Sequence, residues 1–140
     1  MLIQPLSNQL SVTSQIAPAD VAALAVKGFR SIINNRPDGE SDDQPSSAMI
    51  AAAAKQAGLE YRYIPVVPGQ LQPAQVQAFA EALADMPSPV LAFCRSGMRS
   101  STLWALQAPG TADSIVDTAR AAGYDLSGLR QHLGHASGGH

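Results

Sequence analysis

The sequence predicts an α/β domain of three layers, with helices on both faces of a mainly parallel central sheet. Short apolar runs, typical of buried strands, alternate along the chain with amphipathic stretches typical of helices. Glycine and proline punctuate these segments. This alternation favours parallel strands joined by helical crossovers. A chain of 140 residues with 46% hydrophobic residues can bury one sizeable core, so we expect a single domain over residues 1–140.

The predicted elements follow from helix signals and apolar patterning. Pro18 opens the first helix and Gly28 closes it, because proline suits the first helical position and glycine the stop. Ser46 or Ser47 can cap the second helix, which Gly58 ends. In chain order we expect strand 10–13, helix 18–28, strand 29–34, helix 46–58, strand 60–67, a helix opened by Pro73 with an apolar stripe over 76–83, strand 89–93, helices 101–106, 111–122 and 126–133, and a frayed end over 136–140.

The only cysteine of the chain lies where a predicted strand meets a predicted helix. Cys94 directly follows the apolar run 89–93. Unpaired backbone N–H groups at a helix N-terminus, together with the helix dipole, favour an anion and stabilise a thiolate there. We therefore predict that Cys94 is a nucleophile. We also predict that Arg99, with its planar fork of donors, clamps an anion bound beside it.

The residues between this cysteine and this arginine are expected to form an anion-binding loop, and they are Arg95, Ser96, Gly97 and Met98. Gly97 lets the backbone curl so that several N–H groups point inward. Arg95 either makes a positive mouth that attracts anionic substrates or is simply solvated. Ser100 is the third expected catalytic residue, because its hydroxyl can hydrogen-bond the Cys94 thiolate.

The spacing in this loop resembles two enzyme superfamilies. Cysteine-dependent phosphatases have a cysteine, five residues and an arginine. Rhodanese-type sulfurtransferases commonly have Cys-Arg-x-Gly-x-Arg, with four residues between. Residues 94–99 match the shorter pattern. A smaller ring of N–H groups suits a persulfide sulfur, whereas a tetrahedral phosphoryl group needs a wider one.

Over residues 8–108 the chain resembles the phosphatase-like domain family of beta-lactamase hydrolase-like proteins. The matching segments are Ser14-Gln15-Ile16, Gly28-Phe29, Ile33 to Glu40, Ile64-Pro65-Val66 and Pro89 to Trp104. The resemblance implies a cysteine-phosphatase fold of the dual-specificity type. Members of this family occur alone or fused to metallo-β-lactamase-type persulfide dioxygenases. They are associated with phosphatase activity and with sulfur transfer in sulfide oxidation.

Two departures from the phosphatase pattern favour sulfur chemistry. Phe93 stands where phosphatases usually have a histidine, and the loop 67–72 lacks the carboxylate that protonates a leaving oxygen. Sulfur transfer needs no such acid, because the leaving group is the Cys94 thiolate itself. A loop after the strand 29–34 could contribute Arg36 and Asp38, which otherwise form a turn. If that loop folds over the site, it also offers substitute acids, which are Asp38, Glu40, Asp42 and Asp43.

We therefore expect a sulfurtransferase first. Cys94 would take sulfane sulfur from thiosulfate or glutathione persulfide and pass it to a low-molecular-weight thiol or sulfite. The first alternative is a phosphatase acting on a phosphorylated substrate through a Cys94-phosphoryl intermediate. The second is a thiol redox or persulfide sensor without turnover. A separate persulfide dioxygenase is a possible partner in the first case.

Composition narrows the remaining possibilities. A net charge of −2 gives no electrostatic case for nucleic acid or an anionic membrane. The first residues lack the features of a signal peptide, and a lone cysteine cannot form an intramolecular disulfide, so we expect a cytoplasmic protein. His132 and His135 are three residues apart without further ligands beside them, so we expect neither a metal nor a cofactor.

Overall fold

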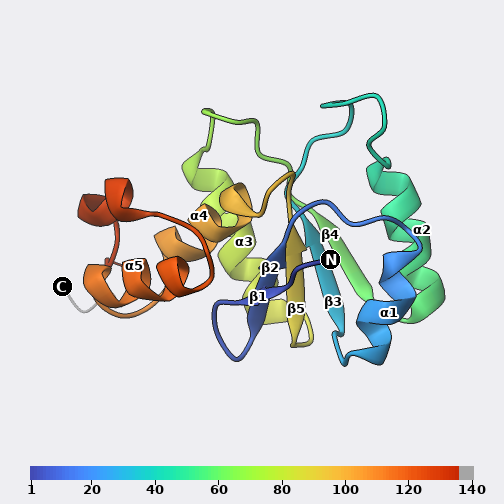
Figure 1. Ribbon diagram of the computed structural model, residues 1–140, viewed down its shortest axis with the longest axis horizontal. Helices are drawn as coiled ribbons and strands as arrows, with labels where there is room; N and C mark the ends of the chain where they lie inside the picture. Colours follow the sequence, from blue (N-terminus) through green and yellow to red (C-terminus); the bar gives the residue numbers. More distant parts are fainter. Residues whose placement is uncertain (136–140) are drawn as a thin grey trace.

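The computed structural model describes residues 1–135, and its five-stranded sheet lies between two groups of helices (Figure 1). The helices α1 and α2 cover one face, and α3, α4 and α5 lie on the other. In chain order the elements are β1 (Gln4–Pro5), β2 (Leu10–Thr13), α1 (Asp20–Val26), β3 (Ser31–Asn34), α2 (Ser47–Ala57), β4 (Glu60–Tyr63), α3 (Pro73–Asp85), β5 (Val90–Phe93), α4 (Met98–Gln107), α5 (Ala112–Ala121) and a 3-10 helix η1 (Ser127–His132). The expected three-layer α/β architecture is confirmed.

The sheet brings the ends of four parallel strands to one edge. Its order is β1-β2-β5-β3-β4, and all neighbours are parallel except β1 and β2. The register aligns the last residues of these strands, which are Thr13, Phe93, Asn34 and Tyr63. Because β5 is the central strand, the residue after it lies at the middle of this edge. Ligands of parallel sheets bind at such an edge.

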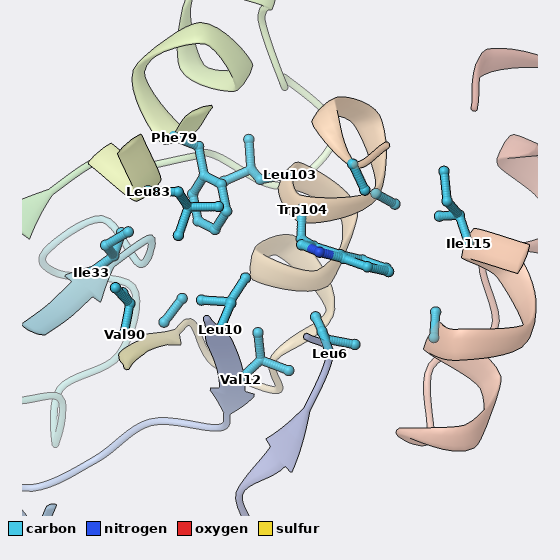
Figure 2. Packing of buried hydrophobic residues seen from close by; sticks show 14 of the residues in the cluster. Leu6, Leu10, Val12, Ile33, Phe79, Leu83, Val90, Leu103, Trp104 and Ile115 are labelled. Atoms are coloured by element: carbon cyan, nitrogen blue, oxygen red, sulfur yellow. The ribbon is translucent and has the colours of Figure 1, made fainter. Parts of the chain in front are cut away.

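Alternating side chains on the central strands supply two hydrophobic cores. On β5, Val90 and Ala92 join the cluster under α3, α4 and α5, whereas Leu91 and Phe93 face α1 and α2. Figure 2 shows the larger cluster, in which side chains from the sheet meet those of α3 and α4, and Trp104 extends toward α5. Trp104 and the stripe around Phe79 are thus core residues, as expected.

Several elements differ from the sequence prediction. The helix predicted from Pro18 begins at Asp20, and the strand predicted from Phe29 begins at Ser31. The short antiparallel strand β1 was not expected, and its two residues carry no alternating pattern. The strand predicted over 60–67 ends at Tyr63, and Pro65, which lacks an N–H, follows closely. The helix predicted from Ser101 begins at Met98, and the last predicted helix is a 3-10 turn. The predicted frayed end lies outside the described residues. None of the helices in residues 1–135 is long and apolar enough to cross a membrane.

Candidate active site

The predicted nucleophile lies at the middle of the sheet edge, directly after β5. Cys94 is fully buried, and the backbone N–H of Gly97 donates a hydrogen bond to its Sγ at 3.0 Å. Gly97 is the N-cap of α4, so the positive end of that helix faces the sulfur. Residues 94–99, called the cysteine loop below, therefore have the strand-to-helix context that the sequence predicts.

Arg99 is held in place by a carboxylate from a distant part of the chain. Its Nη1 donates to Glu40 Oε2 at 2.7 Å and its Nη2 donates to Glu40 Oε1 at 2.9 Å. Nη1 also donates to the carbonyl oxygen of Val66 at 2.8 Å. The loop after β3 and the loop after β4 thus both fold against the cysteine loop. A bidentate pair of this kind fixes the plane of the guanidinium.

One edge of the Arg99 guanidinium has no oxygen partner, and the same side chain interacts with Cys94. An arginine has donors on Nε, Nη1 and Nη2. Both hydrogens of Nη1 and one of Nη2 are engaged by Glu40 and Val66. Within residues 1–135 the Nε–H and the second Nη2–H have no oxygen or nitrogen partner. These parallel donors form the edge that binds a carboxylate or phosphate group through two hydrogen bonds.

A second arginine also donates to the carboxylate of Glu40. Arg36 is buried, and its Nε donates to Glu40 Oε1 at 3.0 Å. Its Nη1 donates to Gln15 Oε1 at 3.0 Å and its Nη2 to Ser41 Oγ at 3.3 Å. Arg36, which the sequence offered as a second-loop contributor, therefore reaches the site through Glu40. We infer that it positions Glu40 and does not itself meet the reacting atoms.

These contacts keep Glu40 ionised. The hydrogen bond from Arg99 lowers the pKa of Glu40 most, and Arg36 adds to it, although partial burial works in the opposite direction. Burial also opposes the charged form of Arg99, but Glu40 and the negative charge of a Cys94 thiolate outweigh it, so the pKa of Arg99 is raised. A carboxylate with a lowered pKa is a poor proton donor at neutral pH. Glu40 is therefore unsuited to the role of substitute acid.

Ser100 does not make the contact that the sequence prediction gave it. Its Oγ is buried and donates to Asn35 Oδ1 at 2.8 Å. Asn35 also donates from its backbone N to the carbonyl of Phe93 at 2.8 Å and from Nδ2 to the carbonyl of Ile64 at 2.9 Å. Ser100 thus ties the first turn of α4 to the ends of three strands. Its expected hydrogen bond to Cys94 is replaced by this one.

The side chain of Asp38 holds the start of α2 in the described residues. Its Oδ1 accepts a hydrogen bond from the backbone N of Ser47 at 2.7 Å, in the first turn of α2. Its own backbone N donates to the hydroxyl of Tyr63 at 2.8 Å. The turn interpretation therefore fits Asp38 better than a catalytic one. Asp43 accepts a hydrogen bond from Ser41, and of the expected substitute acids only Glu40 contacts Arg99 within residues 1–135.

Tyr124 packs on the cysteine loop and was missed by the sequence analysis. Its hydroxyl donates to the carbonyl oxygen of Ser96 at 3.1 Å. Burial, and then the negative charge of a Cys94 thiolate, raise the pKa of Tyr124. A Cβ on Gly97 would lie 2.1 Å from the Tyr124 hydroxyl oxygen. The sequence near Tyr124 does not predict its contact with Ser96, because the two residues are far apart in the sequence.

Replacing Gly97 by alanine is expected to damage the cysteine loop. Gly97 has a φ of +96°, which costs a residue with a side chain about 1–2 kcal/mol, and the added methyl group must displace Tyr124. We expect the free energy of unfolding in urea to fall by about 1–3 kcal/mol. The matched control is Gly128→Ala, because a Cβ there meets nothing within 4 Å. Equal stabilities for the two variants would contradict this account.

Replacing Glu40 by glutamine tests the clamp on Arg99. We expect kcat/KM for an anionic substrate to fall about ten- to hundredfold, because Arg99 loses its fixed orientation. The lowered pKa of Glu40 also has a consequence for stability. Its contribution is present above the ordinary value of 4.5 and is lost as the pH falls below it, through the lowered pKa.

Urea unfolding from pH 7 to pH 3 measures this contribution. The wild-type chain should lose more stability over that range than Glu40→Gln does. The control is Asp85→Asn, which removes an exposed partner of Arg62 at 3.7 Å and should leave kcat/KM unchanged. An identical pH dependence of stability in Glu40→Gln and the wild type would show that the clamp contributes nothing.

Comparisons with known proteins identify the family of this chain. The family model of the phosphatase-like domain of beta-lactamase hydrolase-like proteins matches residues 3–112. The chain belongs to this family. A beta-lactamase hydrolase-like protein from Agrobacterium fabrum is 35% identical over 132 residues, which cover 91% of this chain and 31% of that protein. The phosphatase-like domain described here thus spans less than a third of the length of that relative.

Solved structures place the phosphatase-like domain among cysteine phosphatases in fold. A structure from Neisseria meningitidis, described as a candidate phosphatase, has a TM-score of 0.85 and 35% identity, covering 97% of this chain and 99% of that one. Tk-PTP in its active form has a TM-score of 0.69 at 13% identity, covering 93% of this chain and 91% of that one, which concerns the fold alone. The family resemblance and the dual-specificity-type fold expected from the sequence are confirmed.

These findings revise the order of the predicted functions. The chain is a phosphatase-like enzyme domain, which agrees with the phosphatase alternative better than with the sulfurtransferase expected first. Within residues 1–135 no group of three or more His, Cys, Asp or Glu side chains could hold a metal ion. The roles assigned to Cys94, Arg99 and Ser100 stay predictions.

Proposed function

We propose that the domain is a cysteine-dependent phosphatase that acts on monoesters with acidic leaving groups. The observation that carries the proposal is the edge of Arg99 without an oxygen partner, on a side chain that interacts with Cys94 at the N-terminus of α4. Two parallel N–H donors on Arg99 would bind two oxygens of a phosphoryl group. The N–H groups of the cysteine loop would stabilise the negative charge that develops on the phosphoryl oxygens.

The reaction would take place in two steps. The Cys94 thiolate attacks phosphorus, the bond from phosphorus to the ester oxygen breaks, and the alcohol leaves as its oxyanion. Water then attacks the Cys94-phosphoryl group, releasing phosphate and the thiolate, while the proton lost from water goes to solvent. Because Arg99 and Arg36 hold Glu40 ionised, this carboxylate, the one that contacts Arg99, would not protonate the leaving oxygen in the first step. Esters of phenols with a low pKa would therefore be the preferred substrates.

Sulfur transfer is the second candidate, and the ionised state of Glu40 favours it. The Cys94 thiolate would attack the sulfane sulfur of thiosulfate, so that sulfite leaves and a Cys94 persulfide forms. A thiolate acceptor would then take this sulfur and free Cys94. Neither step needs a proton donor, so the ionised Glu40 would be no handicap. The four-residue spacing from Cys94 to Arg99 is also the one common in rhodaneses. That a separate persulfide dioxygenase acts with this protein stays a prediction. That residues 1–140 form a single domain also stays a prediction.

Mass spectrometry of the intact protein would decide between the two reactions. The protein is mixed separately with 4-nitrophenyl phosphate, thiosulfate and glutathione persulfide, and each sample is quenched in acid. A Cys94-dependent phosphoryl adduct with catalytic release of nitrophenolate would support the phosphatase. A sulfur adduct that cyanide or glutathione removes, without phosphate release, would overturn it in favour of sulfur transfer. A stoichiometric adduct without turnover would overturn both enzyme functions and favour the thiol sensor.

A further inference from the structure

A cavity of about 290 Å³ lies next to the cysteine loop, on the side of the loop after β3. Its volume is close to the lower limit of about 300 Å³ for small-molecule sites. A pocket of this size accommodates a small organic molecule rather than a folded segment. The residues that line it and matter here are Gln15, Arg36, Ser41, Asp43, Gln44 and Arg95.

Most polar side chains of this cavity are already engaged by the protein. Gln15 accepts from Arg36 and donates to the carbonyl of Ile16. Gln44 donates to the carbonyl of Pro37 and accepts from the backbone N of Glu40. These hydrogen bonds fix the walls of the cavity before any ligand arrives. A pre-formed wall lowers the entropy that ligand binding costs.

Arg95 is the exception. Its side chain is exposed, and within residues 1–135 it has neither a carboxylate partner within 4.0 Å nor a side-chain hydrogen bond. Its backbone is held, because the N–H of Gln15 donates to its carbonyl oxygen at 3.3 Å. The guanidinium is thus attached to a fixed point of the cysteine loop, one residue from Cys94, with its donors available.

The charges around the cavity leave a positive excess. Arg36 and Arg99 share the single carboxylate of Glu40. Asp43 accepts a hydrogen bond from Ser41 at 2.8 Å and is the other carboxylate at this place. Among the residues that line the cavity, Arg36 and Arg95 therefore stand against the single carboxylate of Asp43. A ligand that carries a second anionic group, in addition to the group that is transferred, would be favoured here.

We propose that the cavity receives the leaving group of a small substrate that carries a second anionic group, and that Arg95 binds this group. The inference rests on the proposed function, and it names the substrate class of the same site. The phosphoryl group would lie against Arg99 and the cysteine loop. The second anion, a carboxylate or another phosphate, would lie against Arg95, whose donors suit either.

Binding of stable phosphonates, measured by calorimetry on the full chain, tests this inference. The probes are phosphonoacetate and 3-phosphonopropionate, each compared with the alkylphosphonate in which a methyl group replaces the carboxylate. We expect the carboxylated probe to bind about fivefold more tightly, which corresponds to one exposed ion pair of about 1 kcal/mol. A bisphosphonate as a third probe shows whether a second phosphorus group serves better than a carboxylate.

Two exposed arginines provide the variant and its matched control. In Arg95→Gln the ratio of the two affinities should fall to about one. Arg30→Gln removes the same charge near the opposite ends of the strands, next to β3, and should keep the ratio. The full ratio in Arg95→Gln, or no preference in the wild type, would overturn the inference. Alkylphosphonate binding that depends on Arg99 would still support the proposed function. Failure of every phosphonate to bind would overturn both.

Discussion

Replacing Cys94 by serine should lower kcat for 4-nitrophenyl phosphate by about four orders of magnitude or more, because the thiolate is the atom that bonds to phosphorus. A serine hydroxyl stays protonated at neutral pH and is a weak nucleophile. The backbone N–H of Gly97 can donate to a serine Oγ as it does to the sulfur, so the fold should be retained. Release of nitrophenolate at saturating substrate measures the effect.

The same variant separates loss of chemistry from loss of binding. The affinity for an alkylphosphonate should stay within a few-fold of the wild type, because Arg99 and the loop N–H groups are unchanged. The unfolding midpoint in urea provides the control for folding. Residual turnover within about tenfold of the wild type would place the nucleophile elsewhere.

Replacing Arg99 by lysine should lower kcat/KM about a hundred- to a thousandfold, the loss typical of one oxyanion donor. Lysine keeps the charge and can still pair with Glu40. It cannot hold Glu40 and the Val66 carbonyl while presenting two parallel donors to a phosphoryl group. The loss therefore measures geometry and not charge.

Steady-state kinetics of Arg99→Lys beside Arg62→Lys provide the matched comparison. Arg62 forms an exposed pair with Asp85 at 3.7 Å, far along the chain from the cysteine loop, and its replacement should leave kcat/KM unchanged. Equal kinetic constants for the two lysine variants would show that Arg99 has no role in the reaction.

The sequence predicts the fold and the centre of the site because both depend on local signals. Apolar runs, caps such as Ser46 and stops such as Gly58 lie within the segments that they define. Cys94, Gly97 and Arg99 are neighbours in the chain, and a strand followed by a helix is enough to bring them together. The predicted three layers and the loop context of the cysteine follow directly.

The surroundings of the site depend on contacts that no local pattern reveals. Glu40 meets Arg99 across 59 positions, and Tyr124 meets Ser96 across 28. Several carboxylates of the same loop look alike in the sequence, and the folded chain directs one to Arg99 and another, Asp38, to the start of α2. The ranking of sulfur over phosphoryl chemistry rested on the four-residue spacing, on Phe93 in place of a histidine and on the missing carboxylate in the loop 67–72. The start of α4 at Met98 also shapes the loop, and the spacing does not show it.

The side chain of Asn35 has a consequence for how this edge of the sheet moves. Through its backbone and its amide, one residue links the end of β5, the exit of β4 and the first turn of α4. Opening any one of these segments breaks hydrogen bonds of the other two, so they behave as one cooperative unit. Cys94 directly follows β5, so the nucleophile is attached to this cooperative unit.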